Sequence, residues 1–286
     1  MKAVCILGAG PAGLMAAHAA ALTGQPVVIL SYTKKSQLGG AQFLHEPIPE
    51  LTDDEPDVTI RYHRSGSGTQ YQAKAYGSLA QPSFVSFDGV KDKMLQPGWN
   101  LRKMYDRLWD MYGGQITERE ISRETLPGIL EDSLFSLVVS TIPLRSLCRR
   151  PEETTPGGHR FTKQTIMIRN GVCNGGSEPN AIWYDGSRHH SWYRASNLFG
   201  VMSTEWGIQA AHQVPYSMDD GVVVHKPLDT ACDCWPVGER FIKVGRFGRW
   251  QKGTLAHDGF RTTVIALHER GLLTLGEVPI PPLVAE

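Results

Sequence analysis

A glycine-rich turn near the N-terminus constrains this chain more than any other feature. The apolar run at residues 4–7 is followed at once by the hexapeptide GAGPAG at residues 8–13. An alanine-rich segment follows at residues 14–22, and a second apolar run at residues 27–30. Strand, glycine turn, helix and strand in this order form the context in which G-x-G-x-x-G binds a dinucleotide.

Each glycine of the turn has a physical task. Gly8 permits the tight bend, Gly10 lets the backbone approach a diphosphate, and Gly13 lets the helix lie close on the strand. Pro11 and Ala12 begin the predicted helix, whose unpaired N–H groups and positive dipole end would face the phosphates. We therefore expect residues 8–13 to hold the diphosphate of a dinucleotide.

The end of the second strand bears on which dinucleotide binds. This place usually carries an acid that holds the ribose hydroxyls. Here it is Ser31, which offers one hydrogen bond, and Lys34 and Lys35 follow shortly after. A missing carboxylate beside two lysines would accommodate a 2′-phosphate, so the residues alone leave NADP as a candidate.

A second glycine pair, Gly39 and Gly40, follows the ribose position. This arrangement resembles the flavoprotein superfamily of glutathione reductase, amine oxidases and UDP-galactopyranose mutase. The resemblance implies FAD, with NADP the less favoured cofactor, and places both glycines along the flavin. It also puts Ala41, Gln42 and His45 on the flavin or substrate side, with an ordinary loop histidine as the alternative for His45.

The middle of the chain continues the resemblance. Residues 99–112 have apolar and aromatic side chains at helical spacing and predict an amphipathic helix ended by glycine. Strands are predicted at residues 115–121 and 134–139, followed by Thr141 and Pro143. In the superfamily the first of these strands joins the FAD sheet, and the T-x-P turn passes near the cofactor. The β-meander of larger members is reduced or absent, because only residues 122–133 fill the gap.

Other segments predict a mainly β region. Residues 58–63 predict a strand, residues 65–69 a turn, and residues 71–75 the return strand of a hairpin. The polar segment at residues 149–159 is the best candidate linker. Further strands are predicted at residues 161–168, 181–184 and 222–225, and a hairpin turn at Asp185 and Gly186.

A second anchor lies near the C-terminus. Residues 242–248 predict a strand ending in Gly245 and Arg246, and a helix begins within residues 254–258. This resembles the UDP-galactopyranose mutase branch, in which such an arginine reaches the pyrophosphate and the helix N-terminus, here near Leu255, faces the flavin. A surface ion pair is the alternative for Arg246.

The same branch suggests the substrate side. It has an arginine after an aromatic or small residue at the place of Trp192-Tyr193-Arg194. The resemblance implies that Arg194 faces substrate or flavin. Arg194, Tyr193 and His45 are the candidate catalytic residues.

The predicted fold class is α/β, with a Rossmann-like FAD-binding domain that has a parallel central sheet. A smaller, mainly β substrate domain is interleaved with it. We assign residues 1–45, 100–147 and 240–286 to the FAD-binding domain, and residues 46–99 and 148–239 to the substrate or cap region.

Composition narrows the partners. Lys+Arg and Asp+Glu are equal at 29 each, so no net charge draws the protein to nucleic acid, although a nucleotide or nucleic-acid substrate stays open. The sequence has neither a signal-peptide pattern nor a long apolar run, so we expect a cytoplasmic protein without a membrane span.

The five cysteines do not have the spacing of a disulfide framework. Cys5 lies in a predicted strand and is expected to be a core residue. Cys232 and Cys234 are either a metal or redox pair or two unconnected thiols. Because no second ligand pair of zinc-site spacing is present, we expect no metal site.

Four functions follow from these features. The first is an FAD-dependent oxidoreductase in which the flavin accepts a hydride from a small polar substrate, similar to an amine, amino acid, sugar or nucleotide. The second is a mutase-like enzyme whose reduced flavin attacks a nucleotide sugar, with basic groups at Arg188, Arg194, Lys226 and Arg249 for the diphosphate. The others are a non-catalytic flavin-binding protein and an NADP-dependent reductase. The sequence names neither the substrate nor the oligomeric state.

Overall fold

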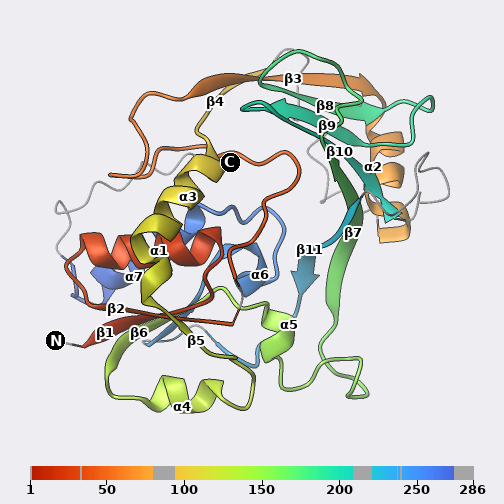
Figure 1. Cartoon of the computed structure of the whole chain (residues 1–286). Coiled ribbons are helices and arrows are strands. Elements are labelled where there is room, and N and C mark those ends of the chain that lie inside the picture. The colour runs from red at the N-terminus through yellow and green to blue at the C-terminus, as the bar shows by residue number, and fades with distance from the viewer. Residues whose placement is uncertain are drawn as a thin grey trace.

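The computed structural model describes residues 2–32, 34–79, 94–208, 221–236, 238 and 240–273. The described strands form a five-stranded and a seven-stranded sheet, which lie side by side in Figure 1. The five-stranded sheet consists of β1 (Ala3–Leu7), β2 (Val27–Ser31), β5 (Ile116–Glu118), β6 (Phe135–Ser140) and β12 (Phe241–Lys243). Its order is β12-β6-β1-β2-β5, and all neighbouring strands are parallel.

The parallel sheet is buried on both faces. Along β1, Val4 and Ile6 pack into one hydrophobic cluster and Cys5 and Leu7 into another. This is why the strand is apolar throughout rather than alternating. The first cluster is covered by α1 (Pro11–Leu22), α3 (Leu101–Tyr112) and α7 (Asp258–Glu269). The second is covered by α4 (Leu126–Glu131), α5 (Leu144–Leu147) and residues around α6 (Gly245–Arg249).

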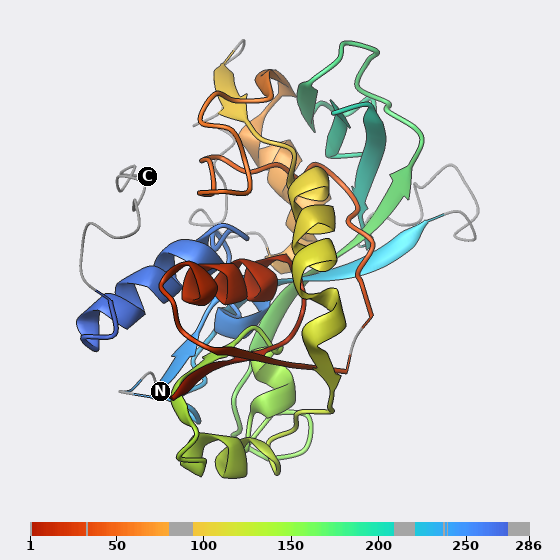
Figure 2. The same ribbon diagram turned by 60° about the vertical axis from the view of Figure 1, so that its left-hand side comes forward.

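Helix α1 lies between α3 and α7 (Figure 2). Its alanines are buried on almost every side, and such small side chains allow neighbouring helices to approach closely. The amphipathic helix predicted over residues 99–112 is confirmed as α3. The side chain of Asn100 caps it by accepting the N–H groups of Arg102 and Lys103, and the short 3₁₀ turn η3 (Gly113–Gln115) follows it.

The second sheet is mainly antiparallel. It consists of β3 (Val58–Gly66), β4 (Leu95–Gly98), β7 (Phe161–Asn170), β8 (Ala181–Gly186), β9 (Arg194–Leu198), β10 (Val201–Gly207) and β11 (Val222–Thr230). The order is β11-β7-β10-β9-β8-β3-β4, and among these described strands only β3 and β8 pair in parallel. A Rossmann-like parallel sheet beside a mainly β region confirms the predicted α/β class. Residues 122–133 hold α4 and no strand, so the β-meander is absent there.

The return strand predicted at residues 71–75 is wrong. These residues belong to α2 (Gly68–Tyr76), which the 3₁₀ turn η1 (Gly77–Leu79) follows. The side chain of Ser67 caps the helix by accepting the N–H of Gln70 at 3.2 Å. Tyr71 and Ala75, four residues apart, then pack against the second sheet. The alternation that suggested a strand is too short to distinguish the two structures.

The hairpin turn predicted at Asp185 and Gly186 is also wrong. Both residues extend β8, and β9 begins only at Arg194. The buried carboxylate of Asp185 binds the Lys74 ammonium at 2.9 Å and His190 Nδ1 at 2.6 Å. An acidic residue that usually favours a turn is here the partner of a buried lysine.

The tight hairpin of this sheet lies between β9 and β10, which the sequence analysis did not separate. Phe199 and Gly200 connect the strands, with φ angles of 53° and 77°. Two positive φ values are the requirement of a type I′ turn, which usually selects asparagine or aspartate before glycine. Phenylalanine at the first position therefore concealed the turn.

Among the described residues, no helix is both long and apolar enough to cross a membrane.

Candidate functional site

The glycine turn between β1 and α1 is closely packed on one side. Gly8 has a φ of 100°, which favours glycine, and a Cβ there would lie 2.4 Å from Thr141 Oγ1. A Cβ on Gly13 would lie 2.0 Å from the carbonyl oxygen of Gly8. Thr141 itself donates its hydroxyl to the Leu7 carbonyl at 2.9 Å, so it supports the turn from β6. Pro143, the N-cap of α5, follows on the same connection.

The other side of the turn is open. A Cβ on Gly10 would meet no heavy atom within 4 Å. Gly10 is the N-cap residue of α1 and makes no side-chain cap, and Pro11 occupies the first turn. The first N–H groups of a helix have no intrahelical partner and attract anions. An uncapped helix beside a glycine that faces open space fits the diphosphate of FAD.

Three helices meet at Ala12. A Cβ on Gly245, at the start of α6, would lie 2.8 Å from the Cβ of Ala12. A Cβ on Gly259, in the first turn of α7, would lie 2.3 Å from the Ala12 carbonyl oxygen. The start of α7 therefore lies against the start of α1. Leu255, just before α7, donates its N–H to Asp258 at 2.6 Å.

The expected ribose position is turned toward the protein. Ser31 is almost fully buried, and its hydroxyl oxygen accepts the N–H of Ala9 at 3.3 Å. This contact fixes the glycine turn against the end of β2, while ribose binding by Ser31 stays a prediction. Lys34 is exposed, and Lys35 forms an ion pair with Asp106 of α3.

Helix α3 connects the two glycine segments. Tyr105 donates its hydroxyl to the Ala9 carbonyl at 3.0 Å. One turn earlier, Arg102 Nη2 donates to the Gly40 carbonyl at 3.1 Å. The glycine turn and the predicted flavin-side segment are thus held by one rigid element. Neither side chain was predicted as a site residue.

The second glycine pair touches the second sheet. Gly40 has a φ of 80°, and a Cβ there would lie 2.6 Å from Glu205 Oε1. The N–H of Ala41 donates to the same oxygen at 3.3 Å. Gln42 closes the loop by donating its amide to the Gly39 carbonyl at 2.8 Å. Only glycine at position 40 lets the segment pass this close to the carboxylate.

Glu205 is the centre of a buried charged cluster, which we call the Glu205 cluster: Tyr193, Arg194, Glu205 and Lys226. Arg194 grips the carboxylate with Nε and Nη2, at 2.6–2.9 Å. Lys226 Nζ lies 3.0 Å from Oε2, and the Tyr193 hydroxyl donates to Oε2 at 2.7 Å. Arg194, Glu205 and Lys226 come from β9, β10 and β11. In the sheet β10 pairs with β9, and β7 lies between β10 and β11.

Burial and charge set the protonation of this cluster. Burial alone would raise the pKa of Glu205, but the charges of Arg194 and Lys226 lower it below its ordinary value. Burial lowers the pKa of Lys226 to about 7, with further repulsion from Arg194 and Arg246 and opposition from Glu205. The cluster therefore keeps an anion at its centre and holds a lysine that titrates near neutral pH.

Arg246 lies in the same region. Its Nε and Nη2 donate to the Pro227 carbonyl of β11 at 3.0 and 2.9 Å. Burial lowers its pKa, and Arg194 adds repulsion. The side chain thus contacts a carbonyl oxygen in the second sheet, and pyrophosphate binding by Arg246 stays a prediction.

His45 lies in a separate aromatic group. Its ring stacks on Phe43 at 4.3 Å between centroids, and its Nδ1 accepts the amide of Gln96 at 2.7 Å. The ring of His257 is 5.7 Å away. Burial lowers the pKa of both histidines, that of His257 to about 4. At neutral pH both rings are therefore uncharged.

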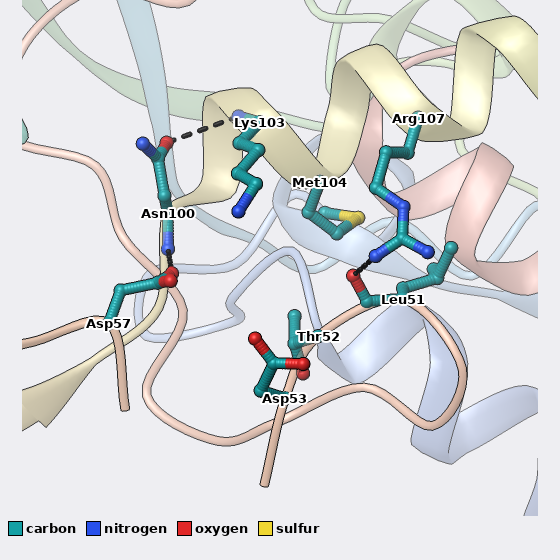
Figure 3. A pocket seen from close by; sticks show the side chains of 8 residues that line it. All are labelled: Leu51, Thr52, Asp53, Asp57, Asn100, Lys103, Met104 and Arg107. Atoms are coloured by element: carbon teal, nitrogen blue, oxygen red, sulfur yellow. Dashed lines mark hydrogen bonds between the residues drawn. The ribbon is translucent and has the colours of Figure 1, made fainter. Parts of the chain in front are cut away.

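A further hollow lies between the start of α3 and the loop at residues 51–57 (Figure 3). Asn100 accepts the N–H of Lys103 at 3.1 Å, and its own N–H donates to Asp57 at 2.7 Å. None of the predicted site residues lines this hollow. Its lining residues are Leu51, Thr52, Asp53, Asp57, Asn100, Lys103, Met104 and Arg107.

A glycine turn leading into an uncapped helix on a parallel sheet defines a dinucleotide-binding protein. Residues 3–82 match the model of the FAD binding domain family. The glycine turn lies within this matched region, and FAD is the cofactor that the matched region binds. No curated protein matches the chain in sequence.

Solved structures support the fold. A reduced UDP-galactopyranose mutase is 11% identical with a TM-score of 0.55, over 95% of this chain and 94% of that one. A flavoprotein/dehydrogenase from Cytophaga hutchinsonii is 11% identical with a TM-score of 0.51, over 94% and 79%. An HpxO variant from Klebsiella pneumoniae complexed with FAD is 10% identical with a TM-score of 0.51, over 94% and 81%.

The sequence pointed to both glycine segments and to Arg194 as candidates, and the structure brings Gly40 and Arg194 to the same carboxylate, but Glu205 was not among the predicted residues. A lone glutamate in a strand of mixed polarity carries a weak signal, because the sequence does not show that its side chain is buried. The available signal was a single acidic residue between Thr204 and Trp206. Its partners, however, lie on other strands.

Proposed function

We propose that this protein is an FAD-dependent oxidoreductase that acts on a small polar substrate of the amine, amino-acid, sugar or nucleotide kind. One observation carries the proposal. The Gly40–Ala41 backbone, predicted to lie along the flavin, contacts the buried carboxylate of Glu205. Groups able to orient a polar substrate and exchange a proton thus lie beside the predicted flavin segment.

The chain's own residues would hold the cofactor at both glycine segments. Gly8, Gly10 and the first turn of α1 would bind the diphosphate, and Ser31 the ribose. Gly39 and Gly40 would line the flavin. Bound FAD supplies the hydride acceptor, while the protein supplies orientation, electrostatics and the exclusion of water.

The Glu205 cluster would act on the substrate. Glu205 fixes the guanidinium of Arg194, which leaves its remaining donors in one orientation toward a polar group. Tyr193 offers a neutral phenol, because burial raises its pKa well above the ordinary value. Lys226, with a pKa of about 7, is suited to take the proton that a substrate releases when it is oxidised.

A second candidate is a mutase-like enzyme that acts on a nucleotide sugar. Three cations lie in one buried region, Arg194, Lys226 and Arg246, and they repel one another. A diphosphate would relieve that repulsion. Glu205 already binds two of the three, which favours the oxidoreductase.

The test is a substrate panel on the FAD-loaded protein without oxygen. We expect an amine, amino acid, sugar or nucleotide to bleach the flavin absorbance without added reductant. Arg194→Lys should slow the bleaching by about tenfold or more while FAD content stays the same, since the fork geometry is lost. The matched control is Arg61→Lys. Arg61 lies on β3 and forms an exposed ion pair with Glu178, so this variant should bleach like wild type.

Other outcomes reject the proposal in distinct ways. UDP-sugar binding that appears only after dithionite reduction would assign the mutase. A bound flavin that responds to neither treatment would assign a non-catalytic flavin protein. Bleaching that is unchanged in Arg194→Lys would remove the Glu205 cluster from the substrate side.

A further inference from the structure

Four metal-ligating side chains from two distant segments converge outside the site described above. Cys148 Sγ lies 3.8 Å from Cys234 Sγ and 3.4 Å from His159 Nδ1. Cys234 Sγ lies 3.5 Å from the same nitrogen. With Cys232, all four ligand atoms lie within 4.8 Å of one another. The structure thus brings Cys232 and Cys234 together with two further side chains that can ligate a metal, Cys148 and His159.

The spacing has the dimensions of a zinc tetrahedron. With Zn–S bonds of about 2.3 Å and Zn–N bonds of about 2.0 Å, a regular tetrahedron has S···S edges of about 3.8 Å and S···N edges of about 3.5 Å. The three measured separations match these edges to within about 0.1 Å. We propose that Cys148, His159, Cys232 and Cys234 form a structural Zn²⁺ site of the Cys₃His type.

The surroundings orient these ligands. His159 Nδ1 faces the thiols, and its Nε2 lies 3.3 Å from the carboxylate of Asp233. A carboxylate behind a histidine fixes the tautomer that leaves the other nitrogen for the metal. Arg150 Nη2 also lies 3.3 Å from Nε2, and this contact cannot be a hydrogen bond when Nε2 carries a proton, because both groups are then donors. The N–H of Arg149 donates to Cys234 Sγ at 3.4 Å, as expected beside a thiolate.

The position of the four ligands gives the site its role. Cys148 directly follows α5, which comes after β6 of the parallel sheet, and His159 precedes β7 of the second sheet; both strands and α5 can be followed in Figure 1. Cys232 and Cys234 lie between β11 of the second sheet and β12 of the first. Two of the connections between the sheets, β6 to β7 and β11 to β12, thus supply the ligands. The metal would tie the outgoing connection to the returning one.

Chemistry favours zinc over a disulfide or another metal. A disulfide would use two thiols and leave the third thiol and the imidazole without a role. Three thiolates and one imidazole in a closed tetrahedral set are typical of structural zinc, whereas catalytic zinc keeps an open position. The site is independent of the flavin chemistry proposed above.

The test is the metal content of the full-length protein, purified under reducing conditions without chelator. We expect about one zinc per chain by elemental mass spectrometry. Cys234→Ser should lose most of it, while Cys173→Ser, which changes a cysteine outside the cluster, should keep it. Replacement by Co²⁺ should give the visible bands of a tetrahedral thiolate site, to the red of the flavin absorbance.

Three results would overturn the proposal. One is no zinc uptake by the reduced wild type in the presence of zinc chloride. Another is rapid alkylation of Cys148, Cys232 and Cys234 in the folded protein, since bound thiolates are protected. The third is iron in place of zinc. If Cys234→Ser does not fold, the cobalt spectrum and the alkylation pattern of the wild type decide the matter.

Discussion

The glycine turn at residues 8–13 and the Glu205 cluster are the two binding surfaces that we propose, and they are built in opposite ways. The turn uses backbone alone, so a substitution that adds side-chain atoms should impair its binding most. The cluster uses side chains from three strands, so a substitution that removes side-chain atoms should impair it most. A binding site made of backbone consists of consecutive residues and can be recognised in the sequence. A binding site made of side chains from several strands depends on how those strands pair.

The largest expected effect comes from adding a side chain to the turn. In Gly10→Val we expect FAD affinity to fall by at least about a hundredfold, since the new side chain occupies the space where the diphosphate would lie. The apo protein should still fold, because a Cβ at Gly10 meets no atom within 4 Å. Flavin content after purification and the thermal midpoint of the apo form would measure the two effects.

Two other glycines sharpen this test. Gly13→Val should lose stability together with flavin, because its Cβ would collide with the Gly8 carbonyl at 2.0 Å. A Cβ on Gly128 in α4 would meet no atom within 4 Å, and this position lies far from the turn in sequence, so Gly128→Val should keep its flavin. Full FAD retention in Gly10→Val would contradict the assignment of the turn to the diphosphate.

The next effect comes from removing the centre of the cluster. In Glu205→Leu, Arg194 and Lys226 would remain buried without their carboxylate, and losing one partner of a buried pair costs about 3–5 kcal/mol. We expect the free energy of unfolding to fall by that amount in urea titrations of the apo protein. FAD affinity should change less than in Gly10→Val.

Glu178 provides the matched comparison for Glu205. It also pairs with an arginine and a second base, Arg61 and His63, but its side chain is 35% exposed where that of Glu205 is 1% exposed. Exposed ion pairs contribute at most about 1 kcal/mol, so Glu178→Leu should have little effect. Equal losses in the two variants would mean that burial does not set the energy of the Glu205 cluster.

This contrast explains what the sequence could predict. The G-x-G-x-x-G turn, the apolar strands at residues 4–7 and 27–30, and the helix at residues 99–112 depend on local patterns, and all of them are present in the structure. Parallel strands are apolar because both faces are buried, which a single sequence displays directly.

The remainder depended on contacts between distant residues. Lys74 in α2 and Asp185 in β8 become a buried ion pair only after the sheet has formed, so α2 and the end of β8 were predicted wrongly. Glu205 was missed for the same reason, and Cys148 and His159 gave no ligand spacing with Cys232 and Cys234. Single residues on separate strands carry no periodic signal, whatever their role in the folded protein.

The smallest expected effect is a pH dependence that belongs to the cluster and not to the turn. The pKa of Lys226 falls from 10.5 to about 7 on folding. Between about pH 7 and pH 10.5 the unfolded chain therefore binds more protons at this lysine, and the free energy of unfolding should rise with pH in that window. Lys226→Met should lose this rise, which has a slope of about 1.4 kcal/mol per pH unit inside the window. The exposed Lys35→Met is the control and should keep the wild-type slope. Parallel slopes in wild type and Lys226→Met would show that Lys226 stays charged beside Glu205, and a proton acceptor would have to be sought elsewhere in the site.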